Sequence, residues 1–195
     1  MKIGKDARIK QITDTTLEII MKKGVSGLTL SEVAKGVGFS EAALFRYYSS
    51  KSELLSETMT HISQSLLEGI YVISKKDSAP VEKLQEIIEF QVDFLSKNKS
   101  LPRILFSDEL HINNPELRAT IMERHKKFIH IISITLKECI EQGVFRKDLD
   151  LNMAAKTVFG LIQTTMFMAS LSDFKENLSD QGTRIFKFLE KTFTT

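Results

Sequence analysis

The chain has 195 residues, of which 42% are hydrophobic and 27% are charged, a composition typical of a water-soluble protein with a packed core. Its formal net charge of only +2 excludes a uniformly basic polypeptide, and the single Cys139 excludes an internal disulfide. No apolar run approaches the roughly 20 residues that span a bilayer, and the charged N-terminus lacks the apolar segment of a secretory signal. We therefore expect a cytoplasmic protein without membrane contact.

The N-terminal segment predicts two helices in succession. The first covers residues 6–23, where apolar residues recur every three or four positions and Gly24 provides the stop. Thr29 is suited to cap the second, and with Glu32 three residues later it forms a T-x-x-E capping box. The second helix is short and ends within ten residues of its cap.

A tight turn and a third helix follow. Gly36 and Gly38 give the chain the freedom to stop and turn. Ser40 is placed to cap the next helix, and Leu44 and Tyr48 lie four residues apart on its inner side. Two short helices joined by such a turn are typical of the helix-turn-helix, which places its second helix in the DNA major groove. We assign this motif to about residues 29–48.

The segment that follows begins a longer helix. Ser50 and Glu53 form an S-x-x-E box, with Lys51 in the first turn of that helix. A free helix N-terminus favours an anion, so Lys51 is suited to a phosphate contact.

These residues resemble the N-terminal signature of TetR-family transcriptional regulators, over about residues 6–55. The shared residues, in order, are Gly38, Phe39, Ser40, Leu44, Tyr47, Tyr48, Ser50, Lys51 and Leu54, with an aromatic residue at position 45. Ala42 and Phe45 depart from the glycine and tyrosine usual in the family. The resemblance implies a ligand-responsive regulator of transcription, and we expect a repressor.

The distribution of charge agrees with a DNA-binding N-terminus. Residues 1–55 contain nine Lys and Arg against six Asp and Glu, a net charge of +3, whereas the remaining residues carry −1. Neutralising phosphates contributes to DNA affinity. An excess of three charges is modest and supports the motif without defining it.

The rest of the chain keeps a helical pattern, and no segment alternates apolar and polar residues as a strand would. Further helices are expected at residues 51–74, 81–96, 102–111, 115–143, 151–171 and 179–193, with Asn114 and Asp150 as caps. The sequence therefore predicts an all-α protein of about nine helices. We expect residues 1–52 to form a three-helix DNA-binding domain and residues 53–195 a larger effector-binding and dimerisation domain.

Resemblance to the family implies a set of DNA-contacting residues. They are Thr29, Leu30, Ser31, Ser40, Glu41, Ala42, Ala43, Phe45, Arg46, Tyr47 and Lys51. Hydroxyl and ammonium groups among them suit phosphate oxygens, while Ala42, Ala43 and Phe45 suit thymine methyl groups. Arg46 could pair with guanine and Glu41 with cytosine, but a solvated surface charge or a phosphate contact explains these two residues equally well.

One helix-turn-helix covers few base pairs, so we expect a homodimer on a palindromic operator. In the family the last two helices usually form the dimer interface. Apolar residues available for it are Val158, Phe159, Ile162, Met166, Phe186, Leu189 and Phe193. Packing in the protomer's own core is an alternative for each of them, and we expect a mixture.

The family resemblance also implies a small-molecule effector in the C-terminal domain. Met and Phe suit an adaptable apolar pocket with a few polar partners, so we expect a hydrophobic effector. Candidate lining residues are Phe90, Phe94, Arg103, Phe106, Met122, His125, Phe128, Gln163, Met166 and Phe167. Ordinary core or surface positions explain each of them as well.

Other classes of function have little support in the sequence. The four histidines show no metal-ligand spacing, and no phosphate loop or nucleophile motif occurs, so we expect neither an enzyme nor a cofactor or metal. Cys139 lies in an apolar run, which more often indicates an inert core thiol than a redox switch. The alternatives are an effector-free DNA-architectural or scaffolding protein and a helical-bundle enzyme.

Overall fold

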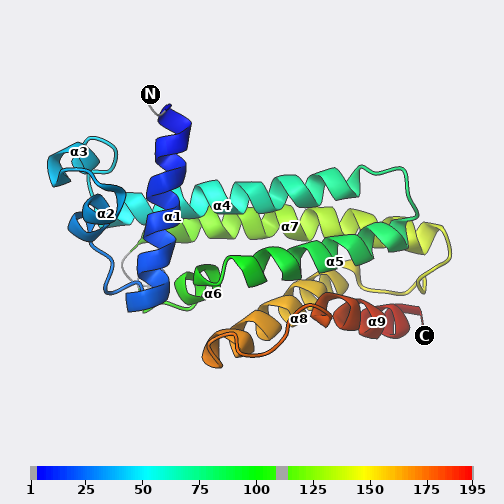
Figure 1. Cartoon of the computed structure of the whole chain (residues 1–195). Helices are drawn as coiled ribbons and strands as arrows, with labels where there is room; N and C mark the ends of the chain where they lie inside the picture. The colour runs from blue at the N-terminus through cyan, green and yellow to red at the C-terminus, as the bar shows by residue number, and fades with distance from the viewer. Residues whose placement is uncertain (1–3, 109–113, 195) are drawn as a thin grey trace. The chain divides into compact units, whose positions relative to one another are not determined.

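The computed structural model describes residues 4–108 and 114–194, and these residues form nine α-helices and no strand (Figure 1). The helices are α1 (Lys5–Lys23), α2 (Leu30–Val37), α3 (Glu41–Phe45), α4 (Lys51–Ser74), α5 (Pro80–Lys97), α6 (Ser100–Leu105), α7 (Pro115–Glu141), α8 (Leu151–Leu171) and α9 (Gln181–Thr194). The all-α prediction is confirmed. None of the helices described is both long and apolar enough to cross a membrane.

The described residues group into two compact units. Unit 1 lies within Met1–Ile62 and Ser100–Ile121, and unit 2 within Ser63–Lys99 and Met122–Thr195. The N-terminal helices and α6 therefore belong to the same unit, although they are far apart in the sequence.

Local capping residues define several helix ends as predicted. The Asn114 Oδ1 accepts a hydrogen bond from the Leu117 N–H at 2.9 Å and caps α7. Asp150 accepts from the N–H groups of Asn152 and Met153, both at 3.0 Å, and caps α8. Gly143, with φ of +73°, follows the end of α7 in a conformation that side chains other than glycine rarely adopt.

Two of the helices whose bounds differ from the prediction are α6 and α9. α6 begins at Ser100 rather than at residue 102, because proline is tolerated inside a first turn, and it ends at Leu105. The predicted end at residue 111 lies outside the described residues. α9 begins at Gln181 rather than at residue 179, since the Ser179 N–H donates to Asn177 Oδ1 in a local turn.

The core of unit 2 is built where α9 packs on α5 and α8 (Figure 1). A Cβ atom on Gly182 would lie 2.7 Å from the Glu89 Cα, so glycine is what lets α9 approach the backbone of α5. Next to it, the Thr183 hydroxyl donates to the Glu89 carboxylate at 2.7 Å. These contacts fix which side of α9 faces inward.

Most of the apolar residues considered for a dimer interface lie inside the protomer instead. Buried within unit 2 are Val158, Ile162, Met166, Phe186, Leu189 and Phe193. Phe159 is half-buried. For six of the seven residues, packing in the protomer's own core is therefore the correct alternative.

Candidate functional site

Within unit 1, α2 begins at a hydroxyl cap. The Glu32 N–H donates to Thr29 Oγ1 at 3.2 Å. The Glu32 carboxylate does not return to the Thr29 N–H, as the predicted capping box requires, but pairs with the Lys23 ammonium of α1. Half of the box forms, and the other half is replaced by a contact between helices.

The two glycines near the end of α2 have different roles. Gly38 has φ of +77° and ends the helix in the left-handed conformation, as predicted. Gly36 is a helical residue, and a Cβ atom there would lie 2.6 Å from Thr15 Cγ2 of α1. The prediction that Gly36 serves the turn is therefore wrong, because this glycine permits close packing of α2 on α1.

The turn leads into α3, which begins at Ser40. The Ser40 hydroxyl accepts from the Ala43 N–H at 3.2 Å, and Leu44 is fully buried. α3 ends at Phe45, earlier than predicted, and Tyr48 is buried beyond its end. Tyr47 stacks on Phe39, with ring centroids 6.2 Å apart, which holds the segment after α3 against the turn before it.

One side of α3 is exposed. Glu41, Ala42, Phe45 and Arg46 are all exposed, as the helical spacing predicts, and 48% of the Phe45 surface is accessible. Phe45 is therefore available for contact with a partner, while the fully buried Leu44 holds the opposite side of the helix. The arrangement presents a short apolar and charged surface on a helix whose other side is tied into the core.

α4 begins at Lys51, shortly after the end of α3. The Glu53 N–H donates to Ser50 Oγ at 3.1 Å, but the Glu53 carboxylate accepts from the N–H and hydroxyl of Ser49, at 2.7 and 2.5 Å. The second predicted box is therefore shifted by one residue. The side-chain bond from Ser49, followed by the backbone bond, lowers the pKa of Glu53.

The eleven predicted DNA-contacting residues divide by exposure. Exposed are Thr29, Ser31, Ser40, Glu41, Ala42, Phe45 and Arg46. Ala43, Tyr47 and Lys51 are half-buried, and Leu30 is buried in the core of unit 1. The structure thus leaves ten side chains at least partly accessible, and Leu30 contributes to packing.

The ten predicted effector residues differ in burial and in the contacts they make. Phe128 and Met166 are buried, Phe106, Met122 and Phe167 are exposed, and Gln163 is half-buried. Arg103 donates to the Met21 carbonyl at 3.0 Å within unit 1. In unit 2, Phe90 pairs with Phe94 and packs on Gly69, where a Cβ atom would lie 2.2 Å from the Phe90 ring.

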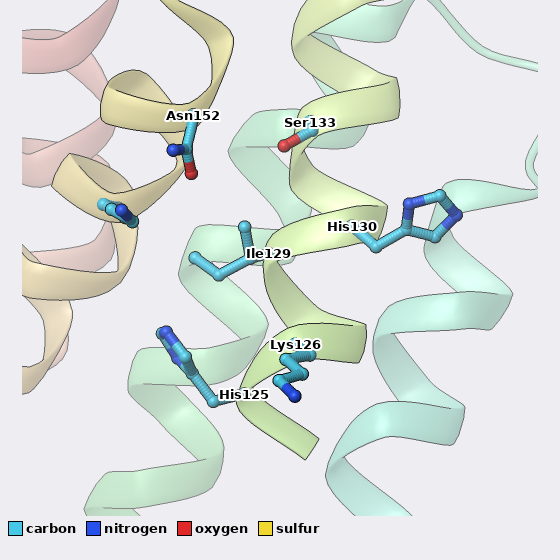
Figure 2. A pocket seen from close by; sticks show the side chains of 7 residues that line it. His125, Lys126, Ile129, His130, Ser133 and Asn152 are labelled. Carbon is cyan, nitrogen blue, oxygen red and sulfur yellow. The ribbon is translucent and has the colours of Figure 1, made fainter. Parts of the chain in front are cut away.

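His125 is the one predicted effector residue that lines the pocket between α7 and α8 (Figure 2). This pocket has a volume of about 420 Å³ and lies wholly in unit 2. Its lining residues are His125, Lys126, Ile129, His130, Ser133, Asn152 and Lys156. The other six residues were not predicted, although the spacing of residues 125, 129 and 133 on one helix, and of 152 and 156 on the next, places each group on one helix side.

The His125 imidazole lies between polar and aromatic groups. Its ring meets Phe159 edge-on with centroids 4.4 Å apart, and Phe159 in turn lies 5.4 Å from Phe128. Burial, and secondarily the charge of Lys156, lowers the pKa of His125. The imidazole is therefore mostly neutral at pH 7.

No group of three or more His, Cys, Asp or Glu side chains in the described ranges could hold a metal ion. Cys139 is buried, and burial is the main cause that raises the pKa of its thiol to about 12. A thiol with that pKa is protonated at neutral pH and is a poor nucleophile.

An all-α chain with a capped helix pair and an exposed second helix is a helix-turn-helix DNA-binding protein. Residues 12–58 match the family model for "Bacterial regulatory proteins, tetR family", and residues 58–192 match the model for "YsiA-like protein, C-terminal region". The chain belongs to the TetR family of transcriptional regulators. It is a DNA-binding regulator and not an enzyme.

Individual relatives share about a quarter of their residues with this chain. The chain is 27% identical to the fatty acid metabolism regulator protein of Bacillus subtilis (strain 168), over 89% of both chains. It is 24% identical to the nucleoid occlusion factor SlmA of Haemophilus influenzae (strain PittGG), over 97% of this chain and 87% of that protein.

Solved structures show the same fold. FadR from Bacillus halodurans superposes with a TM-score of 0.83 at 22% identity, covering 97% of this chain and 96% of that one. FadR from Bacillus subtilis in complex with stearoyl-CoA superposes with a TM-score of 0.80 at 26% identity, covering 92% and 96%.

Proposed function

We propose that this protein is a ligand-responsive repressor that binds a palindromic operator as a homodimer, in the cytoplasm, and is released by a hydrophobic effector. Residues 1–52 bind DNA in this proposal, and residues 53–195 bind the effector and form the dimer. The observation that carries it is the exposed side of α3, where Phe45 and Arg46 are accessible while Leu44 holds the helix to the core.

The exposed residues suit different parts of the DNA. Thr29, Ser40, Tyr47 and Lys51 have hydroxyl or ammonium groups that suit phosphate oxygens, which set the register of the complex. Arg46 and Glu41 are suited to base edges, and Phe45 to thymine methyl groups. Because α3 has only five residues, these few side chains make most of the direct base contacts in this proposal.

Phe45→Ala is expected to weaken operator binding roughly tenfold and binding to scrambled DNA much less, because an apolar base contact discriminates between sequences. Fluorescence anisotropy at fixed salt, on an operator selected from random duplexes, measures both affinities. Tyr71→Ala, which removes an exposed ring in unit 2, is the matched control. Equal losses on operator and scrambled DNA would show that Phe45 does not read sequence.

The proposal of a homodimer is supported by the apolar residues that are exposed on the last two helices of the protomer. These are Met153, Phe167, Met168 and Leu171 on α8 and Phe188 on α9. Gly160 lies on the same side of α8 by helical spacing, and a Cβ atom there would meet nothing within 4 Å. An exposed apolar surface of this kind marks an interaction site.

The effector we propose is a long-chain acyl-CoA. The FadR of Bacillus subtilis is described in complex with stearoyl-CoA, and it aligns with nearly the whole of this chain. A pocket lined by lysine and histidine beside aromatic side chains suits a molecule with an anionic head and an apolar tail.

Saturating stearoyl-CoA is therefore expected to lower operator affinity by about 5- to 150-fold, the usual range of allosteric coupling. Anisotropy titrations with stearoyl-CoA, stearate and CoA measure the effect of each part of the molecule. Unchanged operator affinity with all three would exclude an acyl-CoA effector.

A second candidate is a nucleoid-bound protein that does not respond to an effector. The SlmA proteins of Haemophilus influenzae and Vibrio cholerae, named as nucleoid occlusion factors, align at 24% and 27% identity. This candidate corresponds to the scaffolding alternative. The same titrations distinguish the two candidate functions, because only a repressor of the proposed kind dissociates from its operator when acyl-CoA is added.

A further inference from the structure

The pocket between α7 and α8 combines side chains from two facing helix sides. His125, Ile129 and Ser133 follow one another at intervals of four along α7, and Asn152 and Lys156 do the same along α8. In Figure 2, His125 and Ile129 extend from α7 toward α8, where Asn152 lies, while the His130 ring lies on the opposite side of α7. Lys126 and His130 are therefore placed at the rim.

The side chains that line the pocket bring positive charge and no negative charge. Two lysines and two histidines line it, and none of the seven lining residues is a carboxylate. Lys127, the neighbour of Lys126, pairs with Glu123 at 2.7 Å. Lys126 interacts with the Glu123 carboxylate only through its charge, and among the described residues Lys156 has no ion-pair partner. An anion in this pocket would meet positive charge from both helices.

The imidazole of His125 has an unsatisfied hydrogen-bonding atom. Its Nδ1 atom is buried and has no hydrogen-bond partner within the described part of the chain. A buried polar atom without a partner is costly, and a ligand oxygen that accepts from an Nδ1–H would remove that cost. Asn152 and Ser133 provide further neutral donors in the same pocket.

We propose that this pocket binds the phosphate-bearing head of the effector, with Lys156 as its principal charged contact and His125, Ser133 and Asn152 as hydrogen-bond donors. Lysine binds phosphate as a compact positive charge. In this proposal the acyl chain of the effector runs past Phe159, whose ring contacts His125. The inference rests on the proposed function, since it takes the effector to be a nucleotide-linked acyl thioester.

The assignment of phosphate rather than carboxylate follows from charge. The volume of about 420 Å³ falls in the range of about 300–1,000 Å³ that holds small ligands, so the pocket has room for the groups that carry the phosphates. Two lysines from different helices suit a group with more than one negative charge. Free fatty acid and inorganic phosphate each satisfy part of the site, and both serve as separate probes.

The test is a calorimetric titration of the full-length protein with stearoyl-CoA, CoA, stearate and sodium phosphate. Lys156→Met removes the charge but keeps an apolar stem, and Asn152→Asp adds a carboxylate without changing volume. Both are expected to weaken stearoyl-CoA and CoA binding at least tenfold and to leave stearate binding unchanged. Lys127→Met, which removes an equal charge one residue from the rim of the pocket, is the matched control and is expected to bind all four probes as the wild type does.

The outcomes separate this inference from the proposed function. If both pocket variants bind stearoyl-CoA as tightly as the wild type, or if Lys127→Met loses as much, the pocket assignment is overturned while an acyl-CoA effector stands. If CoA binds the wild type and is lost in Lys156→Met but stearoyl-CoA does not release DNA, the phosphate site stands and the proposed effector is wrong. A wild type that binds neither CoA nor stearoyl-CoA overturns both.

Discussion

Leu44→Ala is expected to lower the free energy of unfolding by about 2–5 kcal/mol, the usual cost of truncating a fully buried leucine. Leu44 has no accessible surface and joins the five-residue α3 to the core of unit 1. Since single domains are stable by only about 5–15 kcal/mol, the loss is a large part of the total. Urea unfolding followed by circular dichroism measures it.

The adjacent Phe45→Ala is the control for this prediction, because Phe45 is exposed on the same helix. It should leave the urea midpoint almost unchanged and reduce operator binding only. Leu44→Ala should weaken binding to operator and scrambled DNA alike, since α3 as a whole loses its fixed position on the core of unit 1. If Leu44→Ala were as stable as the wild type, α3 would not depend on this residue for its position.

Converting Leu171 and Phe188 together to glutamate is expected to produce a monomer and to lower operator affinity at least about 100-fold. The two side chains are 67% and 60% exposed, and both lie on the proposed dimer surface. Charge at the centre of an apolar interface opposes its burial. A dimer gains about 10²–10⁴ in affinity from binding two half-sites at once, and a monomer loses that gain.

Sedimentation velocity gives the oligomeric state, and anisotropy on full and half operators gives the affinity. The control is the double variant Tyr71→Glu with Val72→Glu, which adds the same charge to another exposed apolar pair on α4. It should remain a dimer. A dimeric Leu171→Glu, Phe188→Glu protein would place the interface elsewhere on the chain.

Much of the fold was predictable because helix ends depend on local chemistry. The start of α4 at Lys51 and its end at Ser74 agree with the prediction, and the caps at Ser40, Asn114 and Asp150 form as expected. Each of these hydrogen bonds joins residues two or three positions apart. Residue type and spacing therefore suffice to foresee them.

Two of the predictions failed because a residue met a partner from another helix. The Glu32 carboxylate pairs with Lys23 of α1 instead of completing the capping box. Gly36 lets α2 pack closely against Thr15 of α1 and is not part of the turn. Nothing in residues 29–38 identifies either partner, because both belong to a helix whose contact with α2 exists only after folding.

The amino-acid sequence by itself determined that this protein is helical, where most helices begin and end, and that its second and third helices form a DNA-binding motif. The helices and their ends depend on residues two to four positions apart, and the motif was assigned with the help of the resemblance of about residues 6–55 to the TetR family. Only the tertiary structure decided that Val158 and Ile162 face the core while Met168 and Leu171 face outward, and that His125 and Lys156 line one pocket. α8 carries apolar residues on several sides, so its inward side is chosen by the packing of α5 and α9 and not by its own periodicity.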